Sequence, residues 1–237
     1  STDMQALHAQ AVRACYARIS MVGAVNRAQA DALVATLLAR LPQGNCPPLP
    51  LVEEVQPLSG PSEQRIAFDS AQAHVLVGQP GIKRNSPDYF ALLVGNHILG
   101  GGGFTARLTE ELREKRGLSY SVYSAFAPGL HAGAFTIGLQ TRPDQADQAL
   151  QVSREVLARF VAEGPTEAEL QAAKDNLMGG FALRLDSNRK LLDNVANIAW
   201  NRLPLNYLDT WTQQVERVNA ADVRRAMGRV LQPQRMV

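Results

Sequence analysis

Apolar and polar residues change their spacing several times along the chain, and each change predicts a secondary-structure element. In the stretch Leu99–Ser124, the four glycines Gly100–Gly103 end an apolar helix, because glycine reaches positive φ without steric strain. A second helix is then predicted from apolar residues spaced four apart, with charged residues between them. Its predicted core-facing stripe is Phe104, Leu108 and Leu112.

The end of this second helix and the strand after it carry the candidate chemistry. Gly117 is predicted to end the helix, and a period of two then predicts a strand with Leu118, Tyr120 and Val122 on one face. Arg113 falls in the last helical turn, seven positions before Tyr120. We expect the two side chains to converge on one point above the sheet edge.

The remaining pattern predicts strands first and helices after them. Strands are predicted at 64–68, 73–78, 120–126 and 133–140, and helices at 26–41, 86–98, 144–163, 166–179, 187–202, 205–217 and 220–231. The predicted N-caps of the first, fourth and last of these helices are Asn26, Thr166 and Asn219. The strand at 73–78 is almost continuously apolar, which predicts burial on both faces. The last two strands are expected to form an antiparallel pair. This order predicts an α+β fold, a largely antiparallel sheet with helices packed on one face.

The first sixty residues predict a boundary between domains. The helix at 26–41 has an apolar stripe that needs a partner surface, and the segment 42–60 has the proline-rich composition of a linker. The chain does not begin with Met, and Ser1 leads directly into a helical pattern, so we expect a processed or truncated product.

Composition narrows the function classes. With 46% hydrophobic residues the chain can bury a globular core, and 24 basic against 22 acidic residues give a net charge of +2 without a block of like charge. This excludes the electrostatic footprint of a nucleic-acid-binding protein, and the apolar runs are too short and interrupted for a transmembrane segment. Cys15 and Cys46 are too few for a disulfide framework, and we interpret them as free thiols that leave the redox compartment open.

The glycine run and the sequence after it resemble a known family. Leu-Gly-Gly-Gly, an Arg-Leu pair and Leu-Arg-Glu-Lys-x-Gly-Leu-x-Tyr look like the C-terminal half of the M16 zinc peptidases. This is the pitrilysin family, which also contains the mitochondrial processing peptidases. The resemblance implies the fold of M16 peptidases and LuxS-like metalloenzymes. It implies that residues 1–41 are the tail of an N-terminal peptidase domain, 42–60 a linker and 61–237 the C-terminal domain.

The resemblance also implies a site. The family's zinc lies in the N-terminal domain, and the C-terminal domain contributes an arginine and a tyrosine, here Arg113 and Tyr120, as catalytic residues. We assign Gly101, Gly102 and Phe104 to substrate binding. A phenol and a guanidinium suit this role because peptide hydrolysis builds negative charge on the scissile carbonyl oxygen. The other interpretation is structural, since arginine at a helix end and tyrosine in a half-buried strand are common.

The sequence lacks the residues for a zinc site of its own. His8, His74, His97 and His131 stand alone, without the His-x-x-Glu-His motif, and we expect His74 and His97 to be core residues. We therefore predict that the chain alone binds no catalytic zinc and hydrolyses no peptide. The glycine run lacks the lysine of a phosphate-binding loop, so we interpret it as a tight turn rather than a nucleotide site.

Two functions follow from the resemblance. One is the substrate-binding, transition-state-stabilising part of a zinc metalloendopeptidase. Its implied partners are an unfolded polypeptide substrate, which an exposed sheet edge could bind by strand addition, and an N-terminal domain or subunit that carries His-x-x-Glu-His and the zinc. The resemblance is compatible with a dimer. It does not distinguish the bacterial periplasm from the cytoplasm as the location of the protein. The other function is a non-catalytic scaffold, like the family's core subunits in the respiratory chain.

Overall fold

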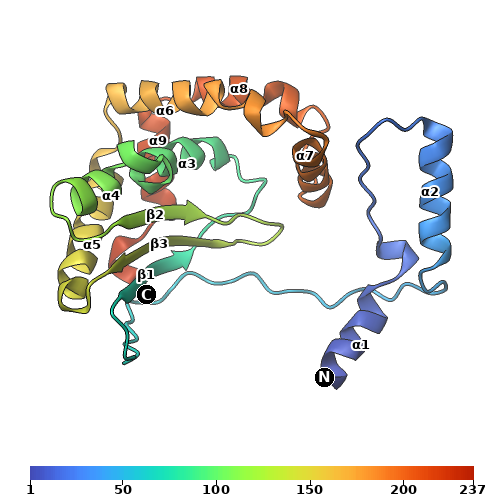
Figure 1. The fold of residues 1–237 in the computed structure, drawn as a ribbon, viewed down its shortest axis with the longest axis horizontal. Coiled ribbons are helices and arrows are strands. Elements are labelled where there is room, and N and C mark those ends of the chain that lie inside the picture. Colours follow the sequence, from blue (N-terminus) through green and yellow to red (C-terminus); the bar gives the residue numbers. More distant parts are fainter. The chain divides into compact units, whose positions relative to one another are not determined.

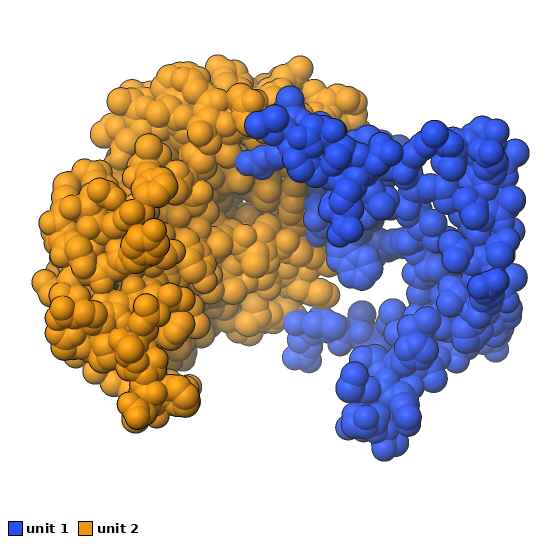
Figure 2. All heavy atoms as spheres, in the orientation of Figure 1, with its two compact units in different colours: residues 1–53, 182–205 blue, residues 54–181, 206–237 orange.

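The computed structural model describes residues 1–237, which divide into two compact units. Unit 1 comprises 1–53 and 182–205, and unit 2 comprises 54–181 and 206–237, as coloured in Figure 2. No helix in either unit is both long enough and apolar enough to cross a membrane.

Unit 2 is built on a three-stranded antiparallel sheet (Figure 1). Its strands are β1 (Ala73–Pro80), β2 (Ser121–Phe126) and β3 (Ala134–Thr141), in the order β1-β3-β2. Its α-helices are α3 (Tyr89–Asn96), the short α4 (Arg107–Thr109), α5 (Ala146–Glu163), α6 (Glu167–Gly179), α8 (Tyr207–Arg217) and α9 (Ala220–Val230). The predicted α+β class and the antiparallel pairing of β2 with β3 are confirmed.

The helices cover one face of this sheet and make the core with it. Phe135, Ile137 and Leu139 alternate along β3 and are buried against the helical layer, which includes Phe160 of α5 and Met227 of α9. The opposite face carries exposed side chains. Period-two alternation therefore gives this sheet one apolar and one solvent-facing side.

The strand β1 differs from its prediction, because it is an edge strand with only one buried face. Val77 is buried, whereas Leu76 is 70% exposed and His74 is exposed, so the expected burial of His74 in the core is wrong. The predicted strand at 64–68 is also wrong: this segment has no regular structure and no neighbour in the sheet. A continuous apolar run does not show whether one or both faces of the strand will be covered.

The predicted starts of α6 and α9 agree with the structure, because an N-cap depends on residues close together in the sequence. The side chain of Thr166 accepts from the backbone N–H of Glu169 at the start of α6, and Asn219 accepts from the N–H of Asp222 at the start of α9. Both helices begin as predicted. The helix expected from residue 86 begins instead at Tyr89, since Ser86 Oγ accepts from the N–H of Asp88 in a preceding turn.

Unit 1 contains α1 (Thr2–Ala11), α2 (Arg27–Ala39) and α7 (Asn188–Trp200). The predicted cap of α2 is confirmed, because Asn26 and Gln29 each accept from the other's backbone N–H. No residue of α2 is buried. The interpretation of the cysteines as free thiols is wrong: Cys15 and Cys46 form a disulfide across the loop that contains α2. The pairing joins residues 31 positions apart, which sequence spacing does not reveal.

A partly buried ion pair joins the start of α4 to the start of α6. Arg107 donates to Glu169 from Nε at 2.6 Å and from Nη2 at 2.7 Å, and Nη2 also reaches the carbonyl of Gly164. The hydrogen bonds from Arg107 are the main reason why the pKa of Glu169 falls from 4.5 to about 2; bonds from Thr166 lower it further. A carboxyl with a lowered folded-state pKa stabilises the fold above its unfolded pKa and loses that stabilisation as the pH falls.

We expect Glu169→Gln to lower the free energy of unfolding at pH 7 by about 1–2 kcal/mol, a value reduced for partial solvent exposure. The difference between wild type and variant should shrink as the pH falls from about 4.5 to about 2. Urea unfolding across this range tests it, with the exposed Glu163 changed to Gln as the control. A difference that stays constant across the range would contradict the assigned cause.

Candidate functional site

The turn between the second predicted helix and β2 brings Arg113 and Tyr120 together. Leu108 and Leu112 are fully buried and anchor the helical segment, which is α4 followed by a π-helical turn, Glu110–Glu114. Gly117 then adopts a φ of +60°. The N–H of Gly117 donates to the carbonyl of Arg113 at 3.0 Å, which closes the helix end as predicted.

Hydrogen bonds hold the chain after Gly117 to β3. Thr141 Oγ1 donates to the carbonyl of Leu118 at 2.6 Å, and Ser119 Oγ lies 2.7 Å from the carbonyl oxygen of Gln140. Leu118 is buried, whereas the next residue but one, Tyr120, is 83% exposed. The prediction that Tyr120 lies on one face of a strand with Leu118 and Val122 is therefore wrong, because β2 begins only at Ser121 and a bend precedes it.

The guanidinium of Arg113 contacts two aromatic rings. Its Cζ atom is 4.6 Å from the ring centroid of Phe104 and 4.8 Å from that of Tyr120. Its Nε is 3.4 Å from a carboxylate oxygen of Glu114. We call Phe104, Arg113 and Tyr120 the aromatic–arginine stack. Cation–π contact with both rings restricts the guanidinium while its side chain stays 29% exposed, so N–H donors can reach a ligand.

Phe104 reaches the stack because the helix expected at this point is broken. Gly103 has a φ of +68°, and Phe104 lies in a short 3-10 turn, 70% exposed. The prediction that Phe104 faces the core with Leu108 and Leu112 is therefore wrong. Its approach to Arg113 was missed by sequence reasoning, since residues nine positions apart do not share a face in a regular helix.

The glycines before Phe104 are required by close packing. A Cβ on Gly101 would lie 2.7 Å from Nδ2 of Asn96, and one on Gly102 would lie 2.6 Å from the carbonyl oxygen of His97. These contacts support the interpretation of the run as a tight turn. The assignment of Gly101 and Gly102 to substrate binding stays a prediction.

The residues of this chain do not fit a zinc site. No group of three or more His, Cys, Asp or Glu side chains is placed to hold a metal ion. His131 is committed to Glu54, with Nδ1 2.9 Å from Oε1, and Lys83 lies 2.6 Å from the same oxygen. His74 is exposed on β1 and takes no part in the contacts among Glu54, Lys83 and His131. The donor set of a catalytic zinc is thus not assembled here.

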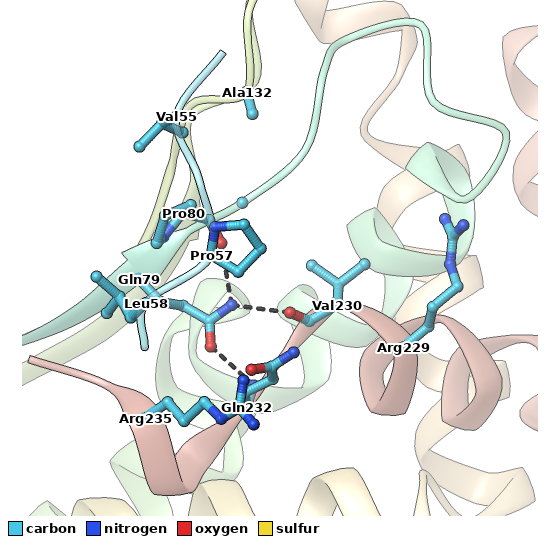
Figure 3. Close-up of a pocket in the computed structure, with 11 residues that line it drawn as sticks. Val55, Pro57, Leu58, Gln79, Pro80, Ala132, Arg229, Val230, Gln232 and Arg235 are labelled. Carbon is cyan, nitrogen blue, oxygen red and sulfur yellow. Dashed lines mark hydrogen bonds between the residues drawn. The ribbon is translucent and has the colours of Figure 1, made fainter. Parts of the chain in front are cut away.

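A separate pocket lies where the segment around Pro57 meets the end of β1 and the end of α9 (Figure 3). The Gln79 side chain lines this pocket. Its Nε2 donates to the carbonyl of Val230 at 2.8 Å, and its Oε1 accepts from the N–H of Gln232 at 2.8 Å. Both the nitrogen and the oxygen of the Gln79 side-chain amide are hydrogen-bonded within the protein. We therefore interpret Gln79 as a structural link between β1 and the end of α9 rather than as a ligand-binding residue.

Comparison with known proteins decides the family. Residues 1–177 match the family described as "Peptidase M16 inactive domain". The chain belongs to this peptidase M16 family. The resemblance seen around Arg113 is thereby confirmed.

Solved and curated relatives agree with this membership. The crystal structure of a peptidase M16 inactive domain from Pseudomonas fluorescens has 37% sequence identity and a TM-score of 0.90, and the match covers 99% of this chain and 56% of that one. An uncharacterized zinc protease of Mycobacterium leprae is 35% identical over 65% of this chain and 35% of its own length. A non-peptidase homolog of Helicobacter pylori is 32% identical over 77% and 42%. The chain thus spans roughly a third to a half of these curated relatives.

Proposed function

We propose that this M16 chain is the substrate-binding, charge-stabilising part of a zinc-dependent endopeptidase whose zinc site lies in another domain or subunit. The observation that carries the proposal is the aromatic–arginine stack, in which Arg113 contacts two exposed rings. An exposed phenylalanine and tyrosine beside a restrained arginine are not needed for packing. They provide a surface for a polypeptide.

The stack suits the chemistry of peptide hydrolysis. Water addition to the scissile carbonyl places a negative charge on its oxygen, and donors fixed in advance at that point stabilise the charge. The Tyr120 hydroxyl supplies one donor, and the free edge of the Arg113 guanidinium supplies others. Phe104 also contacts the guanidinium and offers an apolar contact to a substrate side chain. These roles make Arg113 and Tyr120 the catalytic residues of this chain.

A zinc-dependent function requires a partner domain or subunit that carries the zinc site. The first residues of this chain offer a surface for such a partner. The helix α2 exposes Leu33 and Leu37 by about half, with no buried residue. An apolar stripe of this kind is stable when another surface covers it. We propose that residues 1–41 are the tail of a domain bearing His-x-x-Glu-His, that 42–60 link it to the next domain, and that 61–237 form the C-terminal domain.

A second candidate function is a non-catalytic scaffold. It is favoured by the description of the family as an inactive domain and by the relative named a non-peptidase homolog. A scaffold would use the same fold and partner surface, but it would have no chemical need for the Tyr120 hydroxyl.

Reconstitution separates the two functions. The longer native protein, or this chain mixed with its zinc-bearing subunit, is assayed with a quenched fluorescent peptide, with and without a chelator. We expect the 237-residue chain to be inactive and the assembly to show chelator-sensitive cleavage. A zinc-loaded assembly that binds unfolded polypeptide but cleaves none would support the scaffold instead.

A further inference from the structure

The two cysteines lie in a part of the molecule that has almost no core. Cys15 and Cys46 are both exposed, their Cα atoms are 6.4 Å apart, and their disulfide closes the loop that contains α2. Neither α1 nor α2 has a buried residue. The disulfide is therefore the only covalent tertiary link in a segment that hydrophobic packing does not hold.

Few other contacts close the loop. Arg13 Nη1 donates to the carbonyl of Asn45 at 3.2 Å, and the N–H of Ala14 donates to the carbonyl of Pro42 at 3.4 Å. Both bonds lie within a few residues of the disulfide, and water can replace exposed hydrogen bonds of this kind at little net loss. Without the sulfur–sulfur bond, only weak hydrogen bonds of this kind would join one end of the loop to the other.

We propose that the Cys15–Cys46 disulfide is a redox lock on residues 15–46, closed in an oxidising compartment and opened by thiol reductants. On closure the two thiols lose two protons and two electrons as the S–S bond forms, and the disulfide of a thiol–disulfide oxidoreductase accepts them and becomes a dithiol. Exposure of both cysteines gives such an exchange partner access. The proposal is independent of the peptidase role, and it places the chain where structural disulfides persist rather than in a reducing cytosol.

Thiol counting on the protein purified from its own cells tests whether the lock is closed. Iodoacetamide is added before cell lysis, and the peptides that carry Cys15 and Cys46 are analysed by mass spectrometry without and with prior reduction. We expect no alkylated cysteine before reduction and two after it. Two alkylated cysteines before reduction would overturn the proposal.

Limited proteolysis tests what the lock holds. Trypsin can cut inside the closed loop after Arg18, Arg27 and Arg40. We expect cleavage at these sites to become about tenfold faster on reduction, while the urea unfolding midpoint of unit 2 stays constant. The Cys15→Ser/Cys46→Ser variant should show the fast rate with or without reductant, and Ser62→Ala, a serine outside the loop, should behave as wild type. Equal cleavage rates for the oxidised and reduced protein would overturn the lock.

Discussion

Replacing Tyr120 with Phe should lower kcat of the complete zinc-bearing assembly by about 10²-fold, the usual loss when one oxyanion donor is removed. The substitution deletes one hydroxyl and keeps the ring that stacks on Arg113. Because that donor acts on charge that develops only in the transition state, kcat and kcat/KM should fall together. Steady-state kinetics with a quenched fluorescent peptide measures both.

The control for this change is Tyr123→Phe, which removes a hydroxyl from another exposed tyrosine, three residues later on β2. It should leave the rate unchanged. Both variants should unfold at the wild-type urea concentration, since the Tyr120 side chain is almost fully exposed. An assembly whose peptidase rate is the same with Phe at position 120 would remove the catalytic role of Tyr120 and favour the scaffold function.

Replacing Gly100 with Ala should lower the free energy of unfolding by about 2–3 kcal/mol, at the upper end of the range for overpacking. The π-helical turn His97–Gly101 passes directly against β2. A Cβ on Gly100 would lie 2.5 Å from the backbone nitrogen of Ser124 and 2.8 Å from Cδ1 of Leu108. Because one of these neighbours is backbone in the sheet, rotation of a side chain cannot relieve the contact.

The same substitution should also disturb the link between α3 and the edge of β2. Asn96 Nδ2 donates to the carbonyl of Ser124 at 3.1 Å, and Ser124 Oγ donates to Asn96 Oδ1 at 2.8 Å. Gly179→Ala is the matched control, because a Cβ there meets nothing within 4 Å at the end of α6. It should be neutral or up to about 1 kcal/mol more stable. Equal urea midpoints for Gly100→Ala and wild type would show that the strand is free to move away.

Some features of this protein could be read from short stretches of sequence. The caps at Asn26, Thr166 and Asn219 were predicted correctly because a cap joins residues three positions apart. The glycine that ends the helix before β2 was found for the same reason. The motif around Arg113 also identified the family, since the motif is itself a local pattern.

Other features depend on which distant segments meet, and only the tertiary structure decided them. The strand β1 has one buried face because the helices cover a single side of the sheet, although its apolar run suggested two buried faces. Cys15 forms a disulfide with Cys46, on the other side of α2 in the sequence. The break at Gly103 turned Phe104 outward onto Arg113, where a regular helix would have buried it.

The sequence by itself determined most of the helices, the caps at Asn26, Thr166 and Asn219, the α+β class and the spacing of Arg113 and Tyr120, because these follow from backbone geometry within a few residues. The tertiary structure decided the exposure of Tyr120, the contact of Phe104 with Arg113 and the disulfide. These depend on side chains brought together by packing between segments, and no periodicity in the sequence records that packing.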